Sequence, residues 1–533
     1  MTTSRLSRAI GAGALCTFLL LGQACTDLDE SPLSVITPEN FYQTEDEILG
    51  GLASIYAGLL SSLSQYYNLS EVSTDEFIVP TRGNDWYDGG RWLEIHYQTW
   101  SPTNTSGEDI NGAWNNMFGA ISRATVMLEA LENIAFADKE VVQAEVRTLR
   151  AFYYYILMDL FGGVPIAETT EIMPRERSTR AQVFDFVESE LLAARGSLPV
   201  SWPAAQHGRM TQGAADAILA SLYVNAEVFT GTVTEAGLQP GTARWADAVN
   251  AADNILNSGL YSLPADWMVN FTPDNHLSPE IIMTVKSVAQ DGYGFSEPFL
   301  YRGMHYNSGF GGAWNGFATL AEVYFAFDTA TVETLPVPGT NRTADLLRSN
   351  DRRHDIFLDG QHFHLETGEM VLDRSGVPLF FTPEIRDETQ ANEGEGVRVY
   401  KWPGDPNHTG QWHGNDFAYF RLAEILLIKA EALNEQGQTA EAIQLVNTVR
   451  ERAFDPDQPR PTNVTQAEAR ELIFRERLFE LTAEAKRRQD LIRAGRYLEP
   501  WTHKDQREPY RILMPIPQTQ LDANPLLTQN PGY

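Results

Sequence analysis

The sequence contains very little cysteine. Only Cys16 and Cys25 occur among its 533 residues. Both lie near the N-terminus, so the body of the chain has no thiol at all. A disulfide framework, a cysteine–zinc site and catalysis by a thiol are therefore excluded for the body. A lone cysteine directly after an apolar stretch, as Cys25 is, makes sense mainly as a point of lipid attachment.

Positive charge is also scarce. The chain has 40 Lys and Arg against 71 Asp and Glu, which gives a net charge of −31. Nucleic acid is excluded as a partner because a phosphate backbone requires a cationic surface. Electrostatic attachment to an anionic membrane surface is excluded for the same reason. Disorder does not fit either, since 43% of the residues are hydrophobic and 11% are aromatic.

A long hydrophobic run is present only at the N-terminus. Arg5 and Arg8 precede about thirteen apolar residues that end at Leu21, too few to span a bilayer but typical of a secretory signal. The residues that follow, Gly22-Gln-Ala-Cys25, resemble a bacterial lipobox. We therefore expect residues 1–24 to be removed and Cys25 to be acylated as the first mature residue. Secretion with cleavage after Ala24 and no lipid is the alternative.

Helical periodicity recurs throughout the rest of the chain. Residues 25–40 read as an extended tether, and Thr37 and Pro38 are typical of a helix start. Ser178 is the expected N-cap of a later helix. Amphipathic patterns predict helices at 41–60, 110–135, 139–160, 179–196, 211–229, 243–258, 419–436, 439–454 and 466–494.

The stretch 419–454 is the most informative about the fold. Two amphipathic stripes meet at Gln436-Gly437-Gln438, which predicts a helical hairpin of about 34 residues, the tetratricopeptide period. Leu219–Tyr223 with 243–258 predicts a second such unit, and Ala151 with Tyr154 indicates a third. The sequence therefore predicts a mainly α fold on a tetratricopeptide-like helical-repeat scaffold, with only small sheets.

Two regions lack this periodicity. Residues 61–109 and 262–418 are rich in Gly, Asn, Asp, Pro and aromatics, as in Thr81–Gly90 and Gly309–Gly316. Loops of this length within a folded body are usually functional. We expect them to be loop-rich insertions that carry small β elements and form the ligand face.

Six blocks of sequence, in order, resemble the SusD/RagB family of cell-surface nutrient-binding lipoproteins of Bacteroidota. The most specific is Ala144–Tyr154 running into Leu160–Pro165. The other five blocks are Cys25–Asp29 with Phe41-Tyr42, Gly208–Ala215, Arg421–Ala432 with Val449–Ala453, Glu476–Gly495, and Pro515–Pro517 with Gln529–Tyr533.

The resemblance implies a fold, a role and a location. The fold would be one SusD-like domain over residues 41–533. The role would be to bind a glycan at the cell surface and deliver it to a SusC-like TonB-dependent outer-membrane transporter. The protein would be held in the outer membrane by its lipid, and it would be neither an enzyme nor a carrier of a cofactor. A peptide-binding protein of the same architecture, and a lipid-anchored glycosidase, are the alternatives.

Aromatic residues in the two loop regions are the candidates for ligand contact. A sugar ring has an apolar face that an indole or phenol ring can cover, and hydroxyls that Asp, Asn and Arg can bond. We expect Trp86 and Trp314 to stack on the ligand, with Tyr301 as a third ring. The polar partners predicted from the same stretch are Arg82, Asn84 and Asp85. The alternative is that these rings fill the core beneath the loops.

Sequence motifs for catalysis or metal binding are weak. There is no P-loop, GxGxxG loop, GxSxG elbow or HExxH motif. His362, His364 and Glu366 would share one face of a strand, but such histidines are more often solvated, so we expect no metal site. A pair of carboxylates suited to glycoside hydrolysis stays open because 71 acids guarantee close pairs. Arg150, Arg421, Glu424 and Glu431 are expected to form buried or half-buried ion pairs between helices.

Overall fold

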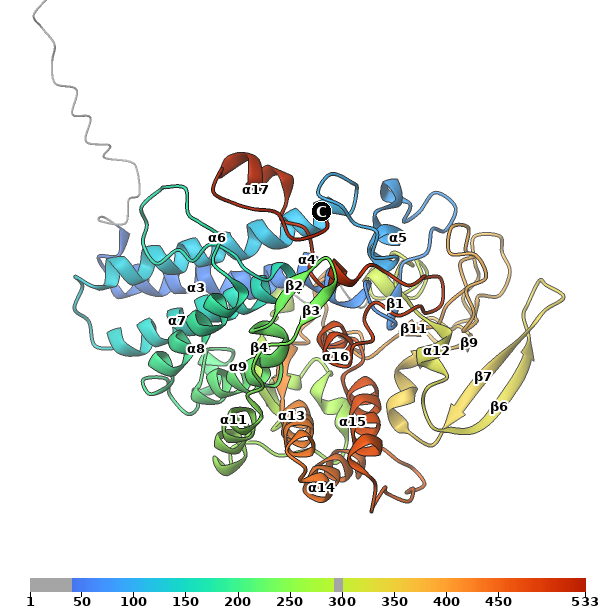
Figure 1. Cartoon of the computed structure of the whole chain (residues 1–533). Coiled ribbons are helices and arrows are strands. Elements are labelled where there is room, and N and C mark those ends of the chain that lie inside the picture. Colours follow the sequence, from blue (N-terminus) through green and yellow to red (C-terminus); the bar gives the residue numbers. More distant parts are fainter. Residues whose placement is uncertain (1–40, 292–300) are drawn as a thin grey trace, which may run out of the picture.

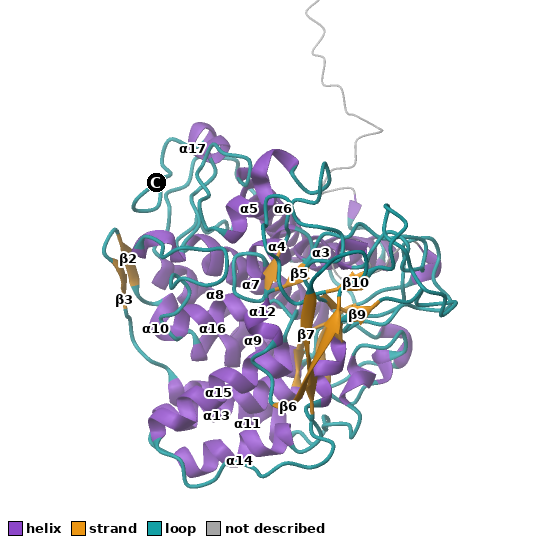
Figure 2. Cartoon of the chain, turned by 90° about the vertical axis from the view of Figure 1, so that its right-hand side faces the viewer, coloured by secondary structure: helices purple, strands orange, loops and turns teal. Residues whose placement is uncertain are grey.

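The structure, a computed structural model, describes residues 41–291 and 301–533. The long helices pack together on one side of the molecule, and most of the short strands and irregular segments lie on the other (Figures 1 and 2). The long helices are α3 (Glu45–Ser62), α6 (Gly107–Leu131), α7 (Lys139–Phe161), α8 (Arg180–Arg195), α9 (Gln212–Val224), α11 (Trp245–Asn257), α13 (Leu422–Glu435), α14 (Thr439–Arg450) and α15 (Gln466–Leu481). The short helices are α4 (Gln65–Glu71), α5 (Arg91–His96), α10 (Ala226–Phe229), α12 (Ala321–Tyr324), α16 (Arg487–Arg493) and α17 (Gln518–Ala523).

The helices pair in sequence order, which confirms the mainly α, tetratricopeptide-like fold. Contacts join α6 to α7, α7 to α8, α9 to α11 and α13 to α14. Small residues allow the close crossings. At Gly58 on α3, a Cβ atom would lie 2.7 Å from the Cβ of Ala120 on α6 and 2.7 Å from the Tyr153 hydroxyl on α7. The central helix α7 is buried from Thr148 to Phe161.

Most predicted helices are present, and their ends have identifiable caps. Thr44, Thr179 and Thr465 each form a capping box with the third helical residue. Thr179, and not Ser178, caps α8. The predicted start at Thr37 and Pro38 lies outside the described residues, and α3 begins at Glu45.

Two predicted helices are interrupted. The first breaks at Asn225, whose side-chain Nδ2 donates to the Ser221 carbonyl at 2.8 Å. The second breaks between α15 and α16, where Ala483 and Ala485 have φ angles of 68° and 59°. Their N–H groups donate to the buried carboxylates of Glu76 at 3.1 Å and Glu71 at 2.5 Å. The left-handed conformation is unfavourable for alanine, and these tertiary bonds hold it in place.

Among the described residues, Glu45–Glu71 is the one helical stretch long and apolar enough to cross a membrane by length and composition. It comprises α3 and α4. Ile48, Leu52, Ile55 and Leu59 of α3 are buried, and the helix packs on α6 and α7. These contacts are those of a core helix.

The described strands form six two-stranded antiparallel sheets, so the expectation of small β elements is confirmed. The pairs are β1 (Phe77–Ile78) with β5 (Ala318–Thr319), β2 (Thr232–Thr234) with β3 (Gly237–Gln239), β4 (Ile281–Val285) with β12 (Phe417–Arg421), β6 (Thr329–Pro336) with β7 (Thr343–Ser349), β8 (Phe357–Leu358) with β11 (Arg398–Val399), and β9 (Gly360–Gln361) with β10 (Phe380–Phe381). In the first pair Phe77 lies opposite Thr319, so this small sheet joins the two loop-rich regions.

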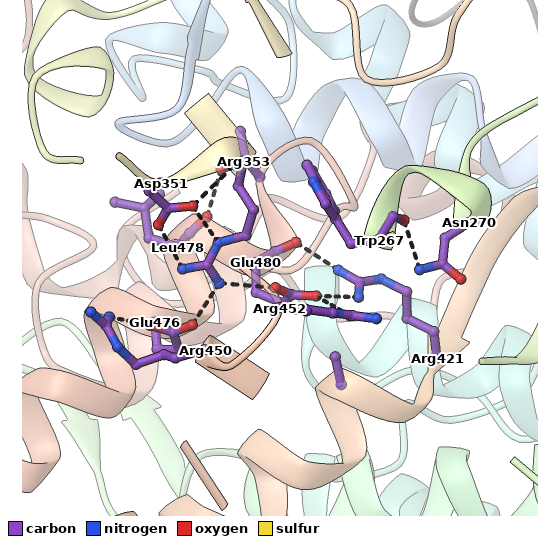
Figure 3. Close-up of polar contacts among 12 residues, drawn as sticks. Trp267, Asn270, Asp351, Arg353, Arg421, Arg450, Arg452, Glu476, Leu478 and Glu480 are labelled. Atoms are coloured by element: carbon purple, nitrogen blue, oxygen red, sulfur yellow. Dashed lines mark hydrogen bonds and ion pairs between the residues drawn. The ribbon is translucent and has the colours of Figure 1, made fainter. Parts of the chain in front are cut away.

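A buried network of charges ties the C-terminal helices to the rest of the chain (Figure 3). Glu480 of α15 lies between three guanidinium groups, with ion pairs of 2.9 Å to Arg353, 2.5 Å to Arg421 and 2.8 Å to Arg452. Burial would raise the pKa of Glu480, but Arg421, Arg452 and Arg353 hold it well below its usual range. Asp351 and Glu476 complete the pairing of Arg353 at 2.7 and 2.5 Å.

The ion pairs expected from the helix sequences are confirmed. Arg150 pairs with Glu190 at 2.6 Å, Glu424 with Lys486 at 2.9 Å and Glu431 with Arg493 at 2.8 Å. Such buried charges are stable only when every partner is present. They therefore fix which helix faces meet.

Candidate ligand-binding site

The β1–β5 sheet brings together the two regions expected to form the ligand face. The chain leaves β1 into the loop that carries Trp86, and it enters β5 from the loop that carries Trp314. The indole Nε1 of Trp86 donates to the Trp314 carbonyl at 2.6 Å. The two tryptophans predicted to act together, 228 positions apart, are therefore neighbours.

Trp86 lies half-buried between the surface and the core. Its φ angle is 62°, and its ring lies on the backbone of Gly316, where a Cβ atom would be only 2.3 Å from its Cε2. The rings of Trp92 and Phe317 lie 5.3 and 6.2 Å away, centroid to centroid. Gly316 is thus required for this packing, and one side of Trp86 belongs to the core.

Trp314 and Tyr87 are the exposed rings of this region. The residue exposures are 38% for Trp314 and 59% for Tyr87. The Trp314 ring lies 6.3 Å from that of Trp86, inclined by 49°. Its backbone is fixed independently of the ring, because its N–H donates to the Tyr301 carbonyl at 2.5 Å. A tilted pair of indoles with one accessible ring is suited to contact a flat apolar surface.

Tyr301 is placed differently from the expectation of a third stacking ring. It is buried, and its hydroxyl donates to the carbonyls of Phe310 at 3.0 Å and Gly410 at 3.3 Å. Its ring meets Trp314 edge-on at 6.0 Å and 74°. Burial raises the pKa of this phenol. Because the Tyr301 ring is buried, it cannot stack on a ligand, and it packs against Trp314 from beneath.

Arg82 is also beneath the surface and not at it. It is 2% exposed, and its guanidinium donates to the carbonyls of Asn315, Asn392 and Glu395. Burial lowers the pKa of Arg82 to about 10. The residue fastens three loops to one another from beneath the surface, where its burial keeps it from a ligand. Asn84 is exposed, as a polar ligand partner requires.

Asp85 belongs to a charged cluster at the edge of the tryptophan pair. Its Oδ2 accepts from the Tyr306 hydroxyl and from Arg374 Nη2, each at 2.5 Å. Arg374 Nε donates to Glu393 at 2.6 Å, and the guanidinium lies 4.5 Å above the Tyr306 ring. His305 Nε2 lies 2.9 Å from Glu393 Oε2. The cluster presents a half-exposed guanidinium held between two carboxylates.

The pKa values of this cluster follow from its bonds. The bond from Tyr306, with that from Arg374, lowers the pKa of Asp85. Burial would raise the pKa of Glu393, but the bonds from His305 and Arg374 lower it. Burial lowers the pKa of His305, so this imidazole is neutral at pH 7. Both carboxylates are therefore ionised acceptors at neutral pH.

No sequence signal pointed to Arg374 or Glu393, because both lie far along the chain from Asp85 and belong to no motif. Among the other aromatics of the two regions, Trp92, Trp100 and Trp402 are core residues.

His362, His364 and Glu366 do not converge on one point. His362 is turned inward to the Ser308 hydroxyl at 2.9 Å, while Glu366 accepts from the Phe310 N–H at 2.6 Å. Within the described ranges, no group of three or more His, Cys, Asp and Glu could hold a metal ion.

Two family models together match most of the chain. The first, described as "SusD family", matches residues 279–533, and the second, described as "Starch-binding associating with outer membrane", matches residues 28–224. The chain belongs to the SusD/RagB family. According to the second description, proteins of this family associate with the outer membrane.

Named relatives match over most of the length of the chain. The chain is 25% identical to SusD-like protein P25 of Formosa agariphila, over 95% of this chain and 96% of the relative. It is 25% identical to the starch-binding protein SusD of Bacteroides thetaiotaomicron, over 88% and 85%. The fold is that of surface glycan-binding protein A from Bacteroides thetaiotaomicron, solved in complex with laminarihexaose. That match has a TM-score of 0.69 and 20% identity, and covers 91% of this chain and 99% of that one.

Proposed function

We propose that this protein binds a glycan at the cell surface through the Trp86–Trp314 region. The observation that carries the proposal is the accessible ring of Trp314, whose carbonyl accepts from Trp86. Trp86 directly follows Asn84 and Asp85 in the chain, and Asp85 pairs with Arg374. An indole covers the apolar face of a sugar ring, while a carboxylate, an amide and a guanidinium bond its hydroxyls. Family membership supports the same role, since named relatives bind starch or were solved with laminarihexaose.

The site favours binding over hydrolysis. A glycosidase needs one carboxylic acid with a raised pKa to protonate the leaving oxygen. Asp85 and Glu393 both have lowered pKa values and both pair with Arg374. Neither can act as the acid at neutral pH, so we propose that the protein is not an enzyme.

The proposed setting is the outer face of the outer membrane. In this proposal residues 1–24 form the signal, acylated Cys25 and residues 25–40 form the tether, and residues 41–533 form one binding domain. Cys25 lies outside the described residues. The glycan would then pass to a SusC-like TonB-dependent transporter.

Binding is tested with the purified mature protein, by isothermal titration against a panel of polysaccharides and peptides. We expect weak binding to at least one glycan, because a shallow site buries little area. A day-long incubation with the bound glycan should release no reducing sugar. Binding only to peptides, or steady sugar release, would refute the proposal.

A further inference from the structure

An exposed apolar tip stands on the loop between α7 and α8. Residues 164–179 contain no helix or strand. At the tip Ile172 is fully exposed, at 101%, and Met173 is 51% exposed. A loop of this length within a folded protein is uncommon and usually has a function.

The loop is fixed in place by many hydrogen bonds. Within it, Arg175 Nη2 donates to the Thr169 and Glu171 carbonyls at 3.1 and 3.0 Å, which closes the chain on either side of the tip. Arg177 fastens its base through the carbonyls of Gly163 at 2.7 Å and Phe161 at 3.0 Å. The backbone is held although its two large apolar side chains contact water.

Other bonds anchor the loop to neighbouring elements. Its Thr170 N–H donates to Glu129 of α6 at 3.2 Å, and Asn524, which follows α17, donates to the Arg175 carbonyl at 2.8 Å. The anchored loop therefore presents two adjacent large apolar side chains to solvent.

The loop lies at the end of the molecule where the described chain begins (Figure 1). Helices α3 and α6 are antiparallel, since Arg123 bonds the Ser54 carbonyl while Ala120 packs on Gly58. Glu129 therefore lies beside the first turns of α3. The loop 164–179, whose Thr170 N–H bonds Glu129, lies there too. Sixteen residues, 25–40, separate the proposed anchor from Phe41, and they span at most about 55 Å when fully extended.

The charge around the tip selects the kind of partner. The exposed charges on the loop and the end of α6 are carboxylates: Glu129, Glu132, Glu168, Glu171 and Glu176. The two cations of the loop, Arg175 and Arg177, are half-buried and bond backbone carbonyls. An anionic lipid surface would repel these carboxylates. A protein with an apolar socket and a rim of Lys and Arg would complement them.

We propose that the loop 164–179 is a docking element for the transporter, with Ile172 and Met173 inserted into such a socket. The inference rests on the proposed function, because it takes the transporter as the partner near which the tether holds the protein. Inserted apolar side chains at the centre of a charged rim are the usual pattern of an interface hot spot.

The test is a double variant, Ile172→Asp with Met173→Asp, in the full chain. The tagged chain is co-expressed with its cognate SusC-like transporter, solubilised in detergent and purified, and the recovered transporter is measured per chain. We expect at least about a tenfold loss, as for one hot-spot side chain. We also expect wild-type recovery to fall as salt rises, because exposed charges are screened.

The matched control is Leu277→Asp, which places the same charge on a 74% exposed leucine elsewhere. It should leave recovery unchanged. Thermal melting and glycan titration of both variants should match the wild type, since Ile172 and Met173 project into solvent.

Each other outcome overturns the inference in a recognisable way. If the double variant recovers as much transporter as the wild type, the loop is not the docking element, while the glycan-binding function stands. If the wild type recovers no transporter, the proposed partner itself fails. If the unacylated chain floats with vesicles containing lipopolysaccharide and the double variant does not, the loop docks on lipid instead.

Discussion

Replacing Trp314 with alanine should separate ligand binding from stability. The ring is 38% exposed, while the backbone of Trp314 carries the carbonyl that accepts from Trp86. Alanine keeps that carbonyl, so the variant removes the accessible ring and leaves the bond to Trp86 in place.

The expected loss of affinity follows from the exposed area. About 38% of a tryptophan surface of about 250 Å² is about 95 Å². Covering that area at about 25 cal/mol per Å² gives about 2.4 kcal/mol. Stacking on nucleobases gives a similar range, about 1–3 kcal/mol. The glycan affinity should therefore fall about 5- to 150-fold.

The melting temperature distinguishes Trp314→Ala from Trp86→Ala. Because the Trp314 ring is half-exposed, Trp314→Ala should lower Tm by no more than about 2 °C. Trp86 packs on Gly316, Trp92 and Phe317, so its loss should cost about 3–5 kcal/mol, which for a chain of this size is a fall of about 3–5 °C.

Glycan affinity is measured by affinity electrophoresis and by titration with the bound glycan. The Tm of each variant is measured by thermal melting. Trp202→Ala is the matched control, since it removes a half-buried indole that lies under Arg209, away from the site. Control and wild type should bind equally. If Trp314→Ala binds as the wild type does, or if its Tm falls by more than about 5 °C, the reasoning is wrong.

Three further changes test other parts of the structure. Arg421→Met should lower Tm by about 3–5 °C at pH 7, because it leaves buried carboxylates without their cation, at about 3–5 kcal/mol. Its partner Glu480 has a pKa well below the unfolded value of about 4.3, so the stability from this pairing is fully present above about pH 4.3 and is lost as pH falls through the lowered folded pKa. The difference in Tm between variant and wild type should therefore hold down to about pH 4 and narrow only below it, and a difference that closes above about pH 4.3 would contradict this. Gly163→Ala should destabilise the base of the 164–179 loop, since its Cβ would lie 2.1 Å from the Ser178 carbonyl oxygen, and proteolysis of that loop should quicken. Cys25→Ala should release the protein from the membrane fraction, and a variant that still fractionates with the outer membrane would refute acylation.

Local sequence was sufficient to predict the helices and their pairing. Amphipathic periodicity and capping residues depend on neighbours a few positions away, so the pattern of α13 and α14 with the turn at Gly437 is readable from the chain alone. Charged residues on helix faces, such as Arg150 on α7, could likewise be predicted from the sequence to form ion pairs between helices. The break at Ala483 and Ala485 is not readable, because alanine favours a helix there and only Glu71 and Glu76, more than 400 positions away, hold the N–H groups.

The sequence singled out the two loop regions, and the structure brings Trp86 and Trp314 of these regions together, but the sequence did not predict where each candidate side chain lies. Composition identified the two loops, since exposed aromatics among glycines are a local property. Whether a given ring faces solvent or core is decided by what covers it. Tyr301 and Arg82 carry the right chemistry but lie beneath the surface, where distant carbonyls take their donors. Arg374 has no motif, and its role beside Asp85 comes from two loops that meet only when the chain folds.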